Sequence, residues 1–366
     1  MDPDRQALPQ GRQHKNISRA EYIRNILPEG KERDVVFDSQ FIYQTHRFFF
    51  LVAIGAFLTP LEAAGEEGFI TTTDGAKLYY QRLGTGQPSV IVPLHLFLYE
   101  PFKNIGKTAV FYDVRNRGRS SRVEDTSTIT LPQDVRDLET VRQHFGVKKV
   151  SLIGYSYAGM MVMLYTLEHP EYVDRVVQLG PVGMKWDKEY PPDESNSDDK
   201  SVIDGAAWNE LQELKKQGWD KEHPREFCEK EWKVMRVRLV GDPAKAAGMT
   251  ASNCQFENEW PTNLHRHFGA HFESIKKLNI SRESVAKISQ PVLTIHGRKD
   301  RNAPYGAGKE WARVLPNGRL ITLPNAAHNS WVDEPNVAEM VKIFLAGSWP
   351  TQAEKVGAHG VRAGLF

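Results

Sequence analysis

The chain has 366 residues, which is enough for one large α/β domain with an insertion, or for two domains. Its formal net charge is +1, which gives no reason to expect a nucleic-acid partner or an acidic surface partner. Only two cysteines are present, so disulfide bonds cannot be its main source of stability. No apolar run reaches the roughly 20 residues of a transmembrane helix, and no stable membrane span is expected.

Residues 1–65 are expected to form an N-terminal extension. The first 45 or so are polar and without clear periodicity, as is typical of a disordered lead-in. A basic flank, His46-Arg47, then precedes the apolar run 48–58, and small residues follow at 63–65. This pattern is typical of a secretory signal and predicts a periplasmic or secreted protein, although the run lies far from the first residue. The alternative is a buried or membrane-surface helix at 48–58, which would leave the protein cytoplasmic.

From Gly68 onward, short apolar runs alternate with helical patterns. Because the runs are apolar throughout, they indicate a mostly parallel, doubly wound sheet that is covered by helices on both faces. Thr130 and Gln133 predict a capping box in front of the first long helix, and Gly146 predicts its end. The expected strands are 69–72, 77–82, 90–92, 109–112, 148–153, 175–179, 291–296 and 319–323, and the expected helices are 131–145, 157–168, 305–315 and 335–345.

The alternation breaks after Pro181 and resumes near residue 285. Residues 184–284 are rich in tryptophan, charged residues and helix formers, and we interpret them as an inserted helical cap. The α/β core is then expected to consist of residues 66–183 and 285–349, followed by a C-terminal tail at 350–366.

Ser156 stands where an expected strand meets an expected helix. The segment reads Gly154-Tyr155-Ser156-Tyr157-Ala158, and the small residues at its ends allow a tight turn that exposes the hydroxyl. The helix N-terminus behind the serine favours developing negative charge. A serine hydroxyl is a weak nucleophile by itself, so it requires a base and a group that orients the base.

Two residues at the ends of later strands can supply these partners. Asp300 follows the strand 291–296, and His328 follows the strand 319–323. The carboxyl ends of parallel strands share one edge of a sheet, so we expect both side chains to meet Ser156 there. In that arrangement His328 removes the serine proton and Asp300 holds the imidazole in the required tautomer. Asp187, just after the strand 175–179, is the alternative orienting group.

These segments resemble the α/β-hydrolase fold superfamily from about Gly68 to Trp349, and within it the proline iminopeptidase-like branch. Besides the serine turn, the segments around Asp300 and His328 match the superfamily motifs that carry the catalytic acid and the catalytic base. Residues 113–120 resemble the D-x-R-G-x-G-x-S turn of the branch, with Asn116-Arg117 in its middle. The resemblance implies a serine hydrolase of the α/β-hydrolase class, and no cofactor or metal is expected.

The chain departs from the superfamily after its third expected strand. A His-Gly sequence is usual there, whereas this chain has His95-Leu96 in what we expect to be a short loop. The loop normally supplies one of two backbone N–H donors to the oxyanion. We assign these donors to Leu96 and Tyr157. The altered loop also leaves open a non-catalytic ligand-binding protein on a hydrolase scaffold.

The cap contains one segment with a clear counterpart in the resembling branch. Proline iminopeptidases bind the free amine of their substrate through a cap glutamate in a Glu-Asn setting. By that resemblance Glu257, Glu259 and Trp260 are candidate substrate-binding residues; the alternative is that both carboxylates are solvated helix ends. His267 and His271 lie one helical turn apart, but no third metal ligand is evident, and we expect no metal.

The sequence supports a serine hydrolase that acts on a small or medium ester or amide, with a small molecule or a short peptide as its partner. An aminopeptidase acting on N-terminal proline is the alternative. Hydrolysis of a carbon–carbon bond uses the same kind of triad and stays open. Cys228 and Cys254 both fall in the cap, and whether they pair stays open too, as does the oligomeric state.

Overall fold

A computed structural model describes residues 65–198 and 201–357 of the chain; the apolar run 48–58 lies outside them. The strands of this part form an eight-stranded sheet in the order β1-β2-β4-β3-β5-β6-β7-β8. The strand β2 pairs antiparallel with both β1 and β4, and every other neighbouring pair is parallel. The strands are β1 (Glu66–Thr71), β2 (Lys77–Leu83), β3 (Val90–Pro93), β4 (Ala109–Tyr112), β5 (Val150–Tyr155), β6 (Val173–Leu179), β7 (Val292–Gly297) and β8 (Gly318–Leu323).

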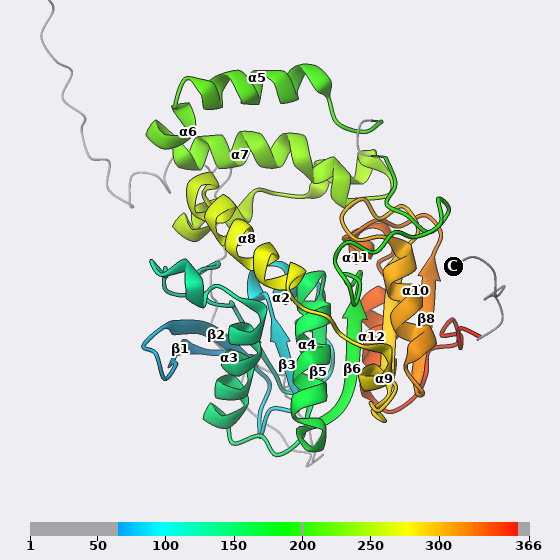
Figure 1. The fold of residues 1–366 in the computed structure, drawn as a ribbon. Helices are drawn as coiled ribbons and strands as arrows, with labels where there is room; N and C mark the ends of the chain where they lie inside the picture. The colour runs from blue at the N-terminus through cyan, green and yellow to red at the C-terminus, as the bar shows by residue number, and fades with distance from the viewer. Residues whose placement is uncertain (1–64, 199–200, 358–366) are drawn as a thin grey trace, which may run out of the picture. The chain divides into compact units, whose positions relative to one another are not determined.

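The central strands carry no alternation of apolar and polar residues because both faces of the sheet are covered. All residues of β3, β4, β5 and β7 are buried, as the sequence analysis expected for a doubly wound sheet. Helices α3 and α4 appear together in front of β3 and β5 in Figure 1, and α10 appears beside β8. The helices are α2 (His95–Phe102), α3 (Leu131–His144), α4 (Tyr157–Glu168), α5 (Gly205–Lys216), α6 (Trp219–Glu222), α7 (Pro224–Met235), α8 (Pro261–Lys276), α9 (Arg282–Val285), α10 (Tyr305–Val314), α11 (Ser330–Asp333) and α12 (Val337–Leu345).

Local sequence signals set the ends of α3, although only half of the predicted capping box forms, because the side chain of Gln133 pairs with Arg136 and Asp137 instead. The hydroxyl of Thr130 accepts a hydrogen bond from the backbone N–H of Gln133 at 3.2 Å, which caps the N-terminus of the helix. Gly146 has φ 60°, a conformation that few residues other than glycine adopt, and it ends the helix by turning the chain toward β5.

The segment after β3 differs from the expected loop. It forms α2, which begins at His95 directly after Leu94, a residue with φ 65°. Leu98 and Phe102 of this helix are buried, and their burial on the core stabilises a helix in a stretch that carries no side-chain N-cap. The superfamily loop is thereby replaced by a helical turn at the carboxyl end of β3.

The residues between β6 and β7 form α5 to α9, with short 3₁₀ turns between α7 and α8. In Figure 1 α5 and α7 lie beyond the end of β6 to which its arrow points, and α8 runs from that layer toward α2 and α4. Helix α8 and the turn before it bond to the core: the amide of Asn258 donates to Ser120 O at 2.6 Å, and Ser274 Oγ accepts from the N–H of Leu131 at 3.0 Å. The 3₁₀ turns are η1 (Thr126–Thr128), η2 (Pro170–Tyr172), η3 (Arg236–Leu239), η4 (Pro243–Gly248), η5 (Ser252–Gln255) and η6 (Glu257–Glu259).

Two further features concern the ends of this arrangement. Leu320 of β8 and Glu354 exchange backbone hydrogen bonds of 2.9 Å, so the first part of the expected tail adds a bridge to the edge strand. Within residues 65–198 and 201–357, no helix is long and apolar enough to cross a membrane.

We predict opposite effects for two glycine-to-alanine substitutions. A Cβ at Gly154 would lie 2.3 Å from the carbonyl oxygen of Ala158, so Gly154→Ala should lower the free energy of unfolding by about 1–3 kcal/mol. Gly269 lies within α8, and a Cβ added there has nothing within 4 Å. Gly269→Ala should therefore raise the free energy of unfolding by about 0.5–1 kcal/mol. Urea unfolding of both variants checks this; equal effects would contradict the packing argument.

Candidate active site

Ser156 occupies a strained turn between β5 and α4. It has φ 56° and ψ −125°, a conformation that costs a non-glycine residue free energy and persists only where the surroundings impose it. Two close approaches impose it here: Gly154 lies against the carbonyl of Ala158, and a Cβ at Gly159 would come within 2.8 Å of Pro181. The turn therefore holds Ser156 at the N-terminus of α4, where its side chain is only partly buried.

The end of β6 ties this turn to the residues that follow β7 and β8. The backbone N–H of Ser156 donates to the carbonyl of Leu179 at 2.9 Å. Gly180 follows with φ 49°, and a Cβ there would lie 3.2 Å from both Asp300 Oδ2 and His328 Nδ1. The structure thus brings the serine turn, Asp300 and His328 to the same carboxyl edge of the sheet.

Asp300 and His328 form a buried pair. The distance from His328 Nδ1 to Asp300 Oδ2 is 2.8 Å, and the other carboxylate oxygen accepts backbone N–H groups from Asn302 and Ala303 at 2.8 and 2.9 Å. A further histidine, His296, places its Nε2 3.2 Å from Asp300 Oδ2. Burial alone would raise the pKa of Asp300, but the two histidines and these bonds hold it below its ordinary value. The carboxylate therefore stays ionised across the neutral range.

The sequence analysis missed His296, although it closes the strand that precedes Asp300. Its Nε2 also lies 3.2 Å from the carbonyl oxygen of Ala303. Both neighbours of this nitrogen are acceptors, so it carries a proton and donates. A histidine ending a strand four residues before the expected acid was the available signal.

The aromatic ring of Tyr155 packs against the imidazole of His328. The ring centroid of Tyr155 lies 4.7 Å from that of His328 and 4.9 Å from that of Trp331. The hydroxyl of Tyr155 donates to Asn329 at 2.5 Å. Among the described residues, the hydroxyl of Ser156 has no hydrogen-bond partner, so the serine–histidine contact of the expected triad is not formed in this structure.

The two backbone groups assigned to the oxyanion differ in their surroundings. Tyr157 is the first residue of α4, where backbone N–H groups lack intrahelical acceptors, so its N–H is open to a ligand. The N–H of Leu96, in contrast, donates to Asp113 Oδ1 at 2.9 Å. The assignment of Leu96 as an oxyanion donor therefore does not agree with this structure, because a buried carboxylate occupies that N–H.

Asp113 joins the turn after β4 to the start of α2. Its second oxygen accepts from the N–H of Arg119 at 3.1 Å, and a Cβ at Gly118 would lie 2.1 Å from it. Burial raises the pKa of Asp113 to about 7, against the effect of the two backbone donors. The sequence analysis quoted this residue as part of a turn motif but did not foresee its contact with Leu96.

The cap carboxylates occupy two different environments. Glu259 is buried and forms two hydrogen bonds of 2.8 Å with Arg117, and it also accepts from the N–H of Gly118 at 2.9 Å. Glu257 is exposed, and Trp260 donates its indole N–H to the carbonyl of Cys254 at 2.9 Å. Glu259 is therefore neither a solvated helix end nor free to bind a substrate amine.

His267 and His271, the two histidines of α8 that could have bound a metal, are both buried. His271 Nε2 lies 2.9 Å from Asp134 Oδ2, and the ring of His267 stacks on that of His271 with centroids 5.5 Å apart. In the described ranges, no three His, Cys, Asp or Glu side chains are grouped so that they could hold a metal ion. Asp187, the alternative orienting group, is exposed and lies 3.5 Å from Lys185.

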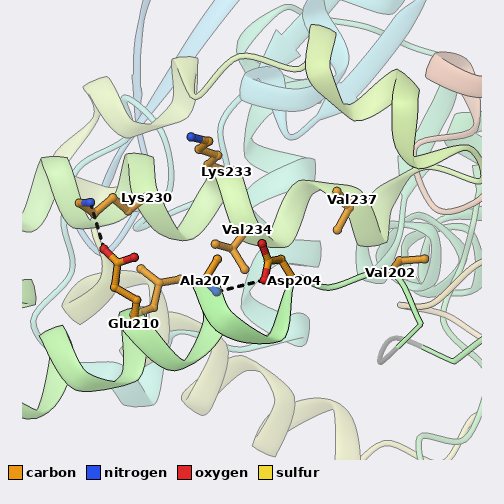
Figure 2. Close-up of a pocket in the computed structure, with 9 residues that line it drawn as sticks. Val202, Asp204, Ala207, Glu210, Lys230, Lys233, Val234 and Val237 are labelled. Carbon is orange, nitrogen blue, oxygen red and sulfur yellow. Dashed lines mark hydrogen bonds and ion pairs between the residues drawn. The ribbon is translucent and has the colours of Figure 1, made fainter.

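Two further features belong to the cap. Cys228 of α7 and Cys254 of η5 form a disulfide, which answers the question that the sequence left open. A cavity of about 290 Å³ lies between α5 and α7, and Figure 2 shows the residues that line it. None of the expected site residues lines this cavity. Its lining residues are Val202, Asp204, Ala207, Glu210, Leu211, Lys230, Lys233, Val234 and Val237.

The pKa of Asp113 predicts how stability depends on pH. An unfolded aspartate loses its proton near pH 4, whereas folded Asp113 keeps it up to about pH 7. Folding therefore takes up a proton between these values, and the contribution of Asp113 to the free energy of unfolding falls as the pH rises from 4 to 7. In urea unfolding, Asp113→Asn should gain stability relative to the wild type over this range, whereas exposed Glu124→Gln should not; a pH-independent difference for Asp113→Asn would contradict the assignment.

Comparisons with known proteins identify the fold family of the chain. A family model described as alpha/beta hydrolase fold matches residues 95–335, which is more than half of the chain. The bifunctional esterase/perhydrolase DCH of Acinetobacter calcoaceticus is 27% identical over 281 residues, covering 71% of this chain and 92% of that protein. A proline iminopeptidase of Xylella fastidiosa is 22% identical over 306 residues, covering 75% and 94%.

Solved structures share the fold at low sequence identity. The 2-hydroxy-6-oxo-6-phenylhexa-2,4-dienoate hydrolase of a Rhodococcus strain superimposes with a TM-score of 0.58 at 18% identity, covering 78% of this chain and 100% of that one. An esterase of Exiguobacterium antarcticum gives 0.54 at 17% identity, covering 77% and 100%. The chain belongs to the α/β-hydrolase fold family and is an enzyme of that family.

Proposed function

We propose that the protein is a serine hydrolase in which Ser156, His328 and Asp300 form a catalytic triad that acts on a small or medium ester or amide. The observation that carries the proposal is the buried 2.8 Å pair of Asp300 and His328 beside a serine held in a strained strand-to-helix turn. Strain of this kind is costly and gathers at functional sites.

In the proposed reaction, Ser156 Oγ attacks the substrate carbonyl while His328 Nε2 takes up its proton. Asp300 accepts from His328 Nδ1, which fixes the tautomer and stabilises the imidazolium that forms. The imidazolium then protonates the leaving group, and His328 activates water to hydrolyse the acyl-enzyme. The missing contact between Ser156 and His328 is compatible with these steps, since catalytic hydrogen bonds are often long in unliganded sites.

The backbone N–H of Tyr157 is the proposed oxyanion donor. It lies at the N-terminus of α4, whose dipole adds a favourable field. The loss of one oxyanion donor typically lowers kcat by about 10²–10³-fold. Leu96 could contribute only if its N–H left Asp113, so the proposal relies on Tyr157 and does not require Leu96.

An aminopeptidase is the second candidate, favoured by the similarity to curated proline iminopeptidases. The cap argues for the ester hydrolase. Of the two cap carboxylates expected to bind a substrate ammonium, Glu259 is taken up by Arg117, which leaves only the exposed Glu257. We therefore place ester hydrolysis first.

The triad predicts a specific pattern of reactivity with a fluorophosphonate probe. The wild type should be labelled, and Ser156→Ala should lose all labelling. Asp300→Asn should lower kcat on p-nitrophenyl butyrate by about 10³–10⁴-fold, because the imidazole then adopts the wrong tautomer. Asp187→Asn serves as the matched control, since Asp187 is exposed, and should keep full activity. A wild type without labelling would support a non-catalytic binding protein instead.

Ester and amide substrates separate the two candidates. We expect turnover of p-nitrophenyl butyrate but no release of naphthylamine from proline β-naphthylamide. Glu257→Gln should leave KM for the ester unchanged, because the side chain is exposed. If the wild type hydrolyses the amide and Glu257→Gln raises the KM for it, the aminopeptidase becomes the first candidate.

A further inference from the structure

Buried polar side chains without hydrogen-bond partners gather between α8 and the core, next to the proposed nucleophile. In residues 65–198 and 201–357, sixteen buried side-chain nitrogen or oxygen atoms lack a partner, and seven of them lie on six residues of this region. Each of the six side chains belongs to a residue that is at least nine-tenths buried. We call them the buried polar cluster: Asn116, Arg117, Asp134, Tyr157, His267 and His271.

Contacts through His271 join four of these six residues into one group. The ring of Tyr157 lies 4.4 Å from that of His271, which stacks in turn on His267. His271 also contacts Asp134 through its Nε2. Because Tyr157 directly follows Ser156, the cluster borders the nucleophile on the side of α8.

Arg117 closes the cluster toward the start of α2. Its guanidinium lies 4.9 Å from the ring centroid of Phe268 and 5.7 Å from that of Phe97. Two of its nitrogens bind Glu259, whereas Nη1 has no partner. Nη1 makes no hydrogen bond of normal length and angle, and its polar neighbour is the hydroxyl of Tyr157, whose pKa the guanidinium lowers against the effect of burial.

Such a concentration of unpaired groups is costly unless something outside the chain binds them. A buried polar group without a partner costs about 1–3 kcal/mol, and folded proteins avoid it almost everywhere. His267 is the extreme case, because both of its ring nitrogens lack partners. Water molecules or a group of the substrate can supply the missing partners.

The charges of the cluster decide which substrate group fits. Arg117 is neutralised by Glu259, and burial lowers the pKa of His267 so that its ring is neutral. Asp134 adds a carboxylate, so an anionic group would face negative charge without a free cation. An ammonium group could donate to Asp134, but it has no acceptor and would leave the donors of Asn116 and Arg117 without partners.

An uncharged group that both donates and accepts hydrogen bonds can pair with the donors of the cluster and with its acceptors. Asn116 Nδ2 and Arg117 Nη1 offer donors, Asp134 Oδ1 offers an acceptor, and neutral His267 offers one of each. We propose that the buried polar cluster is a subsite for a hydroxyl group of the substrate, so that the enzyme prefers esters of hydroxylated acids. This proposal rests on the hydrolase function proposed above.

The test compares matched esters in matched variants. The substrates are the p-nitrophenyl esters of butyric, 3-hydroxybutyric, hexanoic and 6-hydroxyhexanoic acid. The wild type should favour at least one hydroxylated ester over its plain partner by about 10-fold in kcat/KM, the effect of one good hydrogen bond. His267→Leu should bring that ratio close to 1 while leaving the plain esters unchanged.

His267→Leu should not lower stability, because His267 makes no hydrogen bond with the described chain that could be lost. His265→Leu on the same helix is the matched control, since that side chain is exposed, and should keep the preference. His267→Gln retains a donor and an acceptor and should restore part of the preference. It also serves as the test if the leucine variant does not fold.

A binding measurement separates this proposal from the proposed chemistry. Ser156→Ala should bind ethyl 3-hydroxybutyrate or ethyl 6-hydroxyhexanoate more tightly than the plain ester of the same length in calorimetry, even if the wild type cleaves none of them. In that case the subsite stands and the hydrolase function falls. Equal binding and equal kcat/KM for hydroxylated and plain esters would overturn the subsite and leave water as the only occupant.

Discussion

The turn between β5 and α4 is the constraint on which the site depends. Ser156 can keep its strained backbone only because Gly154 lets the chain pass against the carbonyl of Ala158, where any Cβ would lie 2.3 Å away. The hydrogen bond from the N–H of Ser156 to the carbonyl of Leu179 then fixes the turn relative to the end of β6. Gly180, the next residue, has no side chain and so leaves room for Asp300 and His328. A close approach of backbone to backbone thus sets where the serine turn lies relative to the pair of Asp300 and His328.

The interactions that join the cap to the core fix its position but add little to the free energy of unfolding. The buried pair of Arg117 and Glu259 must offset the loss of hydration of both charges, so its net contribution is small, but breaking it would cost about 3–5 kcal/mol. The disulfide supports the same segment, because Cys228 Sγ lies 3.6 Å from the carbonyl of Glu259 and Trp260 bonds to that of Cys254. The turn that carries Glu259 is therefore held from two sides.

One consequence of this arrangement is the contrast between the two sides of the nucleophile. On the side of His328, the polar groups around Asp300 are largely paired, and the imidazole is packed between a carboxylate and an aromatic ring. On the side of α8, buried polar groups lack partners, and a carboxylate occupies the N–H of Leu96. The paired groups beside His328 are typical of a rigid catalytic pair. The unpaired groups beside α8 are typical of a region whose hydrogen bonds a substrate would supply.

The sequence by itself determined the strands, the main helices, the serine turn and the order in which Ser156, Asp300 and His328 occur, because hydrophobic periodicity, caps and small residues act locally. It also indicated one shared edge, since parallel strands place their carboxyl ends together. Only the tertiary structure decided that Glu259 is consumed by Arg117, that Asp113 binds the N–H of Leu96 and that His296 supports Asp300. Those contacts join residues that are far apart in the chain or lie in turns without periodicity, and whether a charge is free or paired depends on which neighbours the fold brings to it.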